Sequence, residues 1–422
     1  MRPIAFRFFF IYFLLTISPW FWLYMIPGIS FFYELYGKAD QWIVELVNTN
    51  LLHVKDQLNS QGGGSGDTSY NWAQFYTYLL LSAFGCLVWT LIDRKRGKYD
   101  LLDFILKNLV RFKICFTAFS YGIIKLFALQ MPEPNLNQLV TPLGDFLPMR
   151  LSWMFIGYST SYQVFSGIME VMVGLLLLNR KTVTLGALLG TAVFTHVFLL
   201  NMSYDIPVKL YSMQIMICCL YLAHYDWHRV VNFFILNKSA EPAISFNYPL
   251  TKKWQRIGRV LFKIGFIYLA VFLTFQQSWG RYKTEVSKAD LKPITSGIYA
   301  IKTFVKNSDT IPDLGNGEMS WRDFIFEKGG LGSIHTSDTL FTQRYRRGYF
   351  TYQVDTARQV IKFIKFRNTT PLFEMYYKIL DDRTISLWGI VRDESLRFEL
   401  VRTDRHFQLT EKQFHWISEA NR

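Results

Sequence analysis

The sequence predicts an α-helical transmembrane bundle of about seven spans, followed by a small all-β domain that is either a barrel or a sandwich. Three observations predict this fold class. Half of the 422 residues are hydrophobic and only 18% are charged, whereas soluble globular proteins have about 25% charged residues. Aromatic residues also reach 18%, which suits rings that face lipid and lie at its interfaces. From about residue 290 the hydrophobic pattern changes to the alternation of half-buried strands.

Seven segments are long and apolar enough to cross a bilayer, which takes about 20 helical residues. They are residues 6–26, 74–93, 108–130, 162–179, 182–201, 206–225 and 257–279. The first segment follows Arg2 and Arg7, as the apolar region of a signal peptide would. Its apolar run is too long, however, and no small-residue cleavage site follows it. We therefore expect a retained anchor.

The distribution of Lys and Arg predicts the orientation of the bundle. Basic residues precede the first span and gather after the second, fourth and sixth spans, whereas the loops at 131–161 and 201–206 are nearly free of them. The positive-inside rule then places the N-terminus in the cytoplasm and the residues after about 280 outside it. The same loops account for the net charge of +14, so we expect anionic membrane lipid as the partner and no nucleic acid.

The loop between the first two spans contains two recognisable segments. Residues 42–54 form an amphipathic stretch that suits the membrane surface. The run at 62–66 is rich in glycine, but it lacks the preceding strand and the following Lys of a phosphate-binding loop. We read it as a turn in which Asp67, Thr68 or Ser69 caps the second span.

Two segments near the C-terminus show the period of antiparallel strands most clearly. Apolar residues alternate with polar ones over 373–379 and again over 396–400, and Asp381, Asp382 and Arg383 form a turn between them. About 130 residues with seven or eight such strands suit a small barrel or sandwich.

Ionisable side chains within the predicted spans are the candidate functional residues, because charge inside a bilayer costs several kcal/mol and is rare there. In the seven-span arrangement, five of them come from four helices and share the outer half of the bundle: Lys125, Glu170, His196, Asp205 and Lys209. Arg111 lies deeper toward the cytoplasm, where its long side chain can reach the interface. Asn201 ends the fifth span beside this group.

Helical spacing suggests a single interior site. Tyr121 and Lys125 are four residues apart and therefore share a face. We assign Lys125, Glu170, His196 and Tyr121 as candidate catalytic residues, and the candidate ligand-binding residues are Arg111, Asn201, Asp205 and Lys209. A structural interpretation stays open: Lys125 and Glu170 would form a buried ion pair that fixes helix register, and His196 would bond a neighbouring helix.

Metal and thiol chemistry have little support in the sequence. No H-x-x-H or H-E-x-x-H spacing is present, so we assign no metal site. Cys86, Cys115, Cys218 and Cys219 all lie in apolar stretches without a C-x-x-C spacing. The neighbouring pair at 218–219 permits redox chemistry, although two small apolar residues inside a helix are the simpler reading.

The region at 105–225 resembles the DoxX-like superfamily of membrane proteins. The resemblance rests on Arg111, the stretch 121–125 (YGIIK), the helix 165–178 with its Glu170, and the basic turn at Arg180. The stretch 201–209 (NMSYDIPVK) resembles a larger, Bacteroidetes-type subgroup. The resemblance implies a four-helix core, a bacterial inner membrane and a periplasmic C-terminal domain. Relatives include a subunit associated with thiosulfate–quinone oxidoreduction, which implies a quinone or another lipophile near Lys125 and Glu170.

These observations predict four regions: N-terminal transmembrane helices with a long extracytoplasmic loop at 1–104, the DoxX-like core at 105–225, a cytoplasmic loop with the last span at 226–284, and the β-rich domain at 285–422. The first functional hypothesis is quinone- or lipophile-linked redox in the bundle. The alternative is a non-enzymatic assembly or cargo-handling protein whose β domain binds a protein partner or lipid. Helices followed by an outer β domain also resemble the vitamin K-dependent carboxylase group in architecture, which leaves a carboxylase-like enzyme as a third hypothesis.

Overall fold

The protein folds into two compact units, which we describe separately. The computed structural model describes residues 3–20, 28, 30–60, 66–94, 98–242, 249, 251–311, 321–338, 341–368, 370–410 and 416–417. The helical unit comprises Met1–Gln130 and Ser161–Trp279, and the barrel unit comprises Met131–Thr160 and Gly280–Arg422. The barrel unit is therefore built from two separate stretches of chain.

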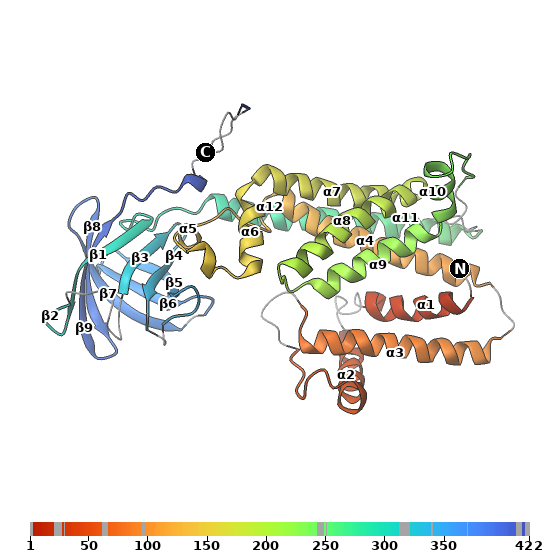
Figure 1. The fold of residues 1–422 in the computed structure, drawn as a ribbon, viewed down its shortest axis with the longest axis horizontal. Helices are drawn as coiled ribbons and strands as arrows, with labels where there is room; N and C mark the ends of the chain where they lie inside the picture. The colour runs from red at the N-terminus through yellow and green to blue at the C-terminus, as the bar shows by residue number, and fades with distance from the viewer. Residues whose placement is uncertain are drawn as a thin grey trace. The chain divides into compact units, whose positions relative to one another are not determined.

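Helices account for nearly all of the regular structure in the helical unit (Figure 1). Two short segments, η2 and η5, are π-helical, and η4 is a 3₁₀ turn. The elements are α1 (Pro3–Ile17), α2 (Ser30–Val47), η2 (Asn48–Leu52), α3 (Ser69–Ile92), α4 (Asp100–Leu126), α7 (Thr160–Leu178), η4 (Arg180–Thr182), α8 (Val183–Ser203), α9 (Lys209–His224), α10 (Trp227–Phe234), α11 (Lys253–Ile267), η5 (Tyr268–Leu273) and α12 (Thr274–Val286).

Four helical segments among the described residues are long and apolar enough to span a membrane: Ser69–Ile92, Thr160–Leu178, Arg180–Ser203 and Lys253–Val286. They correspond to the second, fourth, fifth and seventh predicted spans. The other three predicted spans contain α1 with 15 residues, α4 with 27 residues and several charges, and α9 with 16 residues. Residues 21–26 of the first predicted span lie outside the described residues. The total of seven spans stays a prediction.

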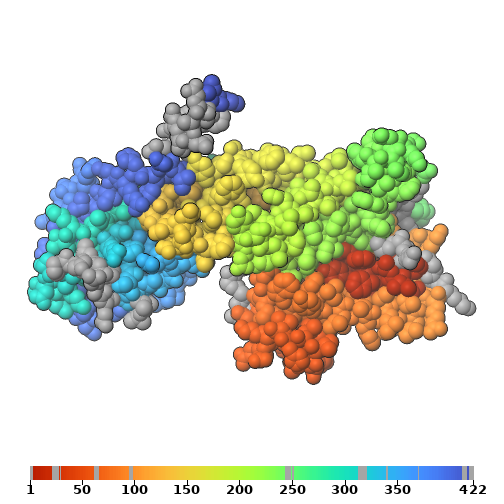
Figure 2. Space-filling view, in the orientation of Figure 1, coloured from red at the N-terminus to blue at the C-terminus, as the bar shows by residue number. Residues whose placement is uncertain are grey.

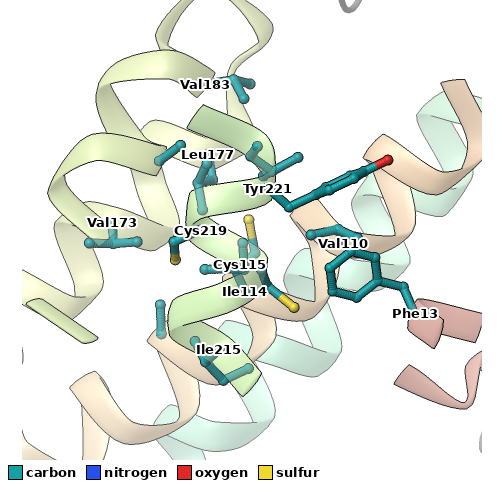
Figure 3. Packing of buried hydrophobic residues seen from close by; sticks show 14 of the residues in the cluster. Phe13, Val110, Ile114, Cys115, Val173, Leu177, Val183, Ile215, Cys219 and Tyr221 are labelled. Atoms are coloured by element: carbon teal, nitrogen blue, oxygen red, sulfur yellow. The ribbon is translucent and has the colours of Figure 1, made fainter. Parts of the chain in front are cut away.

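Apolar side chains from several helices form one core in the helical unit. Figure 3 shows Phe13 of α1 beside Tyr221 of α9, with ring centroids 4.8 Å apart, and Cys115 and Cys219 among aliphatic side chains. All four cysteines are buried as free thiols. In this setting Cys218 and Cys219 act as small apolar residues of the core.

The barrel unit contains a closed, antiparallel eight-stranded barrel, and this closure decides between the barrel and the sandwich. Each long strand pairs with its neighbours in the order β1-β3-β4-β5-β6-β7-β8-β9, and β1 also pairs with β9. The short β2 adds to β1 at one end. The strands are β1 (Gly297–Lys306), β2 (Asp309–Thr310), β3 (Trp321–Glu327), β4 (Leu331–Thr336), β5 (Arg347–Asp355), β6 (Val360–Lys365), β7 (Pro371–Ile379), β8 (Thr384–Val391) and β9 (Glu394–Arg402).

Aromatic side chains fill the barrel. Trp321 stacks on Phe398 with ring centroids 5.1 Å apart, and Phe363 stacks on Phe373 at 4.6 Å. An eight-stranded barrel is just wide enough for side chains to fill it. The alternating segments predicted at 373–379 and 396–400 are strands β7 and β9, which confirms these predictions. Residues 381–383 form a turn as predicted, but it leads from β7 into β8, a further strand between the two segments.

The segment 131–160 packs against the barrel within the same unit (Figure 2). It contains α5 (Leu136–Leu139), η3 (Leu143–Asp145) and α6 (Pro148–Tyr158). The backbone and side chain of Asn137 both donate to Glu327 of β3, and Ser333 of β4 donates to Asn137. Arg347 of β5 donates to Ser333 and pairs with Asp323. The sequence predicts this segment only as a loop.

Candidate functional site

Two glycines let helices α4 and α7 approach closely. A Cβ on Gly167 would lie 2.7 Å from the carbonyl oxygen of Gly122 and 2.9 Å from the Cβ of Lys125. A Cβ on Gly122 would lie 3.0 Å from the carbonyl oxygen of Gly167. Because backbone atoms cannot move aside as a flexible side chain can, this crossing requires small residues on both helices. The crossing places Lys125 next to α7.

Lys125 and Glu170 form an ion pair at this crossing, between residues 45 positions apart in the chain. Their side chains are only 7% and 2% exposed. The Lys125 ammonium donates to Oε1 of Glu170, whereas the buried Oε2 accepts no hydrogen bond from any residue that the structure describes. An ionised carboxylate only accepts hydrogen bonds. Oε2 of Glu170 therefore remains able to accept a hydrogen bond in an apolar interior.

Tyr121 lies one helical turn before Lys125 on α4. Its ring centroid lies 6.2 Å from that of Tyr211 on α9. No described residue hydrogen-bonds to the Tyr121 hydroxyl group. The structure thus gives this region an ammonium group, a phenol and a carboxylate oxygen with spare capacity, which together can donate to and accept from one small polar group.

The structure does not bring His196 to this ion pair. His196 is an exposed residue of α8, and it forms no hydrogen bond or ion pair with a described residue. Spacing along α8 predicted its depth in the bundle, but depth does not determine which way a helical side chain points. We therefore do not retain His196 as a proton-exchanging member of the interior site.

Arg111 of α4 contacts the C-terminal end of α7 and does not join Lys125 and Glu170. Its guanidinium group donates to the carbonyl oxygens of Leu177 and Leu178, the latter at 2.8 Å. These carbonyls belong to the last turn of α7, where no further turn of the helix supplies donors. A capping role accounts for the burial of this charge without a ligand.

Asn201, Asp205 and Lys209 stabilise the turn between α8 and α9. Asn201 donates to the hydroxyl oxygen of Ser212 at 3.0 Å, and Lys209 pairs with Asp205 at 2.6 Å. The Asp205 side chain is 82% exposed. No hydrogen bond or ion pair links these residues to Lys125 or Glu170. The five charged groups predicted to share one site therefore separate into an interior pair, a surface pair and an isolated histidine.

Asp67, one of the three residues predicted to cap the second span, caps the N-terminus of α9 instead. Asp67 accepts from the backbone N–H groups of Lys209 at 2.6 Å and Leu210 at 3.0 Å. Thr68, its neighbour, caps α3 as predicted, by accepting from the backbone of Asn71. A carboxylate at a helix N-terminus is stabilising, so adjacent residues cap two helices.

The crossing itself yields a testable prediction. We expect Gly167→Ala to destabilise the helical unit by about 1–3 kcal/mol, since the new methyl group must displace the backbone of α4. Thermal unfolding of the full chain in detergent would measure the loss. The matched control is Gly258→Ala on α11, where a Cβ meets no atom within 4 Å. Equal stability of both variants would contradict the close crossing.

The polar network of the barrel unit was missed by the sequence analysis. Asn137 and Glu327 are 190 residues apart, and no local pattern links them. Burial raises the pKa of Glu327, although the two hydrogen bonds from Asn137 oppose the shift. The only local signal was the basic run at 344–347, which contains three arginines within four residues.

Comparison with known proteins finds a relative of part of the chain. The chain is similar to the uncharacterized protein YwoB of Bacillus subtilis (strain 168), with 31% identity over 127 residues, which are 29% of this chain and 79% of YwoB. No protein-family model matches the chain, and no solved structure matches it.

Proposed function

The chain belongs to the family of the Bacillus subtilis protein YwoB, whose name states no activity, and we therefore propose a function from the geometry of the helical unit. We propose that this unit binds a quinone-type lipophile beside Lys125 and Glu170. The observation that carries the proposal is the buried Oε2 of Glu170, which lacks a hydrogen-bond donor among the described residues. Leaving such a group unsatisfied costs about 1–3 kcal/mol, and a bound ligand that donates a hydrogen bond recovers this energy.

The residues present fit the reduced form of a quinone in particular. A hydroquinone has hydroxyl groups that donate, which suits the free oxygen of Glu170. The Tyr121 hydroxyl group is a donor for an acceptor oxygen on the same ligand. When bound, such a molecule would supply two-electron redox chemistry. Glu170 would accept a hydrogen bond from a ligand hydroxyl group at its Oε2, and Lys125 would supply the counter-charge of the carboxylate.

The proposal also includes the arrangement in the membrane. We propose seven spans with a DoxX-like four-helix core, in a bacterial inner membrane with the N-terminus in the cytoplasm and the barrel unit in the periplasm. The support is the charge of the loops, since Lys and Arg gather in alternate connections along the chain. The four apolar segments long enough to span a membrane agree with a membrane location.

Binding of a defined probe tests the ligand site. We expect decylubiquinol to bind to the full chain in detergent, and we expect Glu170→Gln to weaken binding by about tenfold or more, since a hydrogen bond to a charged group contributes about 1.5–3 kcal/mol. Isothermal titration calorimetry would measure both. The matched control is Glu34→Gln, which makes the same change at an exposed position of α2.

Unchanged binding in the double variant Lys125→Ala, Glu170→Gln would contradict the proposed site. That result would favour the alternative in which the chain is a non-enzymatic assembly or cargo-handling protein that acts through its barrel unit. The filled interior of the barrel means that any such partner would contact its outer surface.

A further inference from the structure

A basic cleft lies on the barrel unit, and none of the residues that line it belongs to the proposed lipophile site. Its volume is about 260 Å³. One wall is the connector 140–145, and the other walls come from β3, β4, the turn before β5 and the segment after β9. The charged and titratable residues that line it are Asp145, Arg322, Asp323, His335, Tyr345, Arg346, Arg347 and Arg405.

The charge of this cleft is unbalanced. Four arginines line it against two aspartates. Arg347 is buried and pairs with Asp323, so this ion pair is already satisfied. The guanidinium groups of Arg322, Arg346 and Arg405 are exposed and form no ion pair with a described residue. Three guanidinium groups therefore face one remaining carboxylate, that of Asp145.

His335 gives a second, independent sign of an unfilled site. Its Nδ1 is buried and has no hydrogen-bond partner among the described residues. Burial lowers the pKa of His335, and the charges of Arg347, Arg322 and Arg346 lower it further, opposed by Asp323. Three of the four arginines that line the cleft thus act on one point of it. A neutral imidazole there can either donate or accept a hydrogen bond.

The backbone also holds one of these arginines in an unfavourable conformation. Tyr345 and Arg346 are the central residues of a turn closed by the Arg347 N–H and the Arg344 carbonyl at 3.0 Å, and both have positive φ, 56° and 55°. Turns of this type favour Asn and Gly at these positions. Side chains as large as Tyr and Arg in this conformation are strained, and strain of this kind concentrates at ligand sites.

We propose that this cleft binds a phosphate group, carried either by a free phosphorylated small molecule or by a phospholipid headgroup. The planar guanidinium group matches phosphate oxygens with two parallel hydrogen bonds, and Arg322, Arg346 and Arg405 supply three such groups. The cleft is slightly smaller than the ~300–1,000 Å³ typical of pockets for drug-sized ligands, so it suits a compact group. The inference goes beyond the proposed function, because no residue of the helical unit takes part.

Calorimetry with three probes tests the inference and separates the two sources. The full chain would be held in phosphatidylcholine nanodiscs and titrated with inorganic phosphate, glycerol phosphate and dihexanoyl phosphatidic acid. We expect binding of at least one probe. We expect Arg322→Gln with Arg346→Gln to weaken it by about tenfold or more. Both residues are exposed, so the variant should fold, and circular dichroism would check this.

A matched control removes the same charge elsewhere on the barrel. Arg358→Gln with Arg397→Gln changes two exposed arginines that do not line the cleft, and we expect affinity within about twofold of the original chain. Binding of phosphate or glycerol phosphate would support a free ligand, and binding of phosphatidic acid alone would support a lipid headgroup. Absence of binding by all three probes, or an equal loss in the control, would overturn the proposal.

Discussion

Replacing Lys125 alone is expected to destabilise the helical unit by about 3–5 kcal/mol, because Lys125→Met leaves the Glu170 carboxylate buried without a counter-charge. Glu170 is 1% exposed, and Lys125 is its hydrogen-bond donor. Denaturation of the full chain in mixed detergent, followed by circular dichroism, would measure the loss.

The double variant Lys125→Met, Glu170→Met tests whether the unpaired carboxylate causes this loss of stability. Replacing both members of a buried pair by apolar side chains is often neutral or stabilising, so we expect most of the lost stability to return. The control is Lys209→Met, which breaks the surface pair with Asp205 and should cost less than about 1 kcal/mol. If the double variant were no more stable than Lys125→Met alone, the unpaired charge of Glu170 would not be the source of the loss.

The double variant also separates stability from function. A pair that only fixes helix register would be dispensable once both charges are gone. If the pair forms the ligand site, the double variant would be stable and would no longer bind decylubiquinol. Stability and binding measured on the same preparation therefore distinguish the two interpretations that the sequence left open for Lys125 and Glu170.

The strands and the long apolar helices were predictable because their signals are local. The period-2 pattern at 373–379 depends only on which residues face the filled interior of the barrel. The pairing of Lys125 with Glu170 was predictable because an apolar interior leaves a charge few alternatives to an opposite charge. His196 had no such constraint, and the structure leaves it exposed on α8.

The hydrogen bonds of Asn137 with Glu327 and Ser333 could not be predicted from local signals, since these are polar residues in ordinary polar stretches. Asn137 lies in the connection between α4 and α7, almost two hundred residues from Glu327, and only the folded chain brings them together. The segment 131–160 was interpreted as a loop because it lies between two predicted spans and is nearly free of Lys and Arg. Its helices are short and are stabilised by contacts with the barrel, which periodicity along the segment does not reveal.

Replacing Asn137 tests how the segment 131–160 is held on the barrel, and its effect should depend on pH. We expect Asn137→Ala to destabilise the barrel unit by about 3 kcal/mol at pH ~7.5, because buried Glu327 loses a side-chain donor and Ser333 loses its acceptor. Hydrogen exchange of peptides from β3 and β4, measured by mass spectrometry on the full chain, would report the free energy of opening.

The sign of the pH dependence follows from Glu327. Burial raises its pKa in the folded protein above the ordinary value of 4.5, so between these two pKa values the folded state binds more protons than the unfolded state. Stability therefore falls as pH rises through that window and stays lower above it. Loss of the Asn137 donor raises the folded pKa further and extends the fall to higher pH. The destabilisation by Asn137→Ala should thus be smaller at pH ~4.5 than at pH ~7.5.

A second substitution isolates the carboxylate as the cause. Adding Glu327→Gln to Asn137→Ala removes the titrating group, so the two pH conditions should then give the same loss of stability. The amide of the new glutamine can still accept from the backbone N–H of Asn137, which the alanine substitution leaves in place. A pH-dependent loss that persisted in this double variant would show that another group is responsible. If Asn137→Ala caused no loss of stability, the backbone hydrogen bond and apolar contacts would be enough to hold the segment on the barrel without the side-chain network.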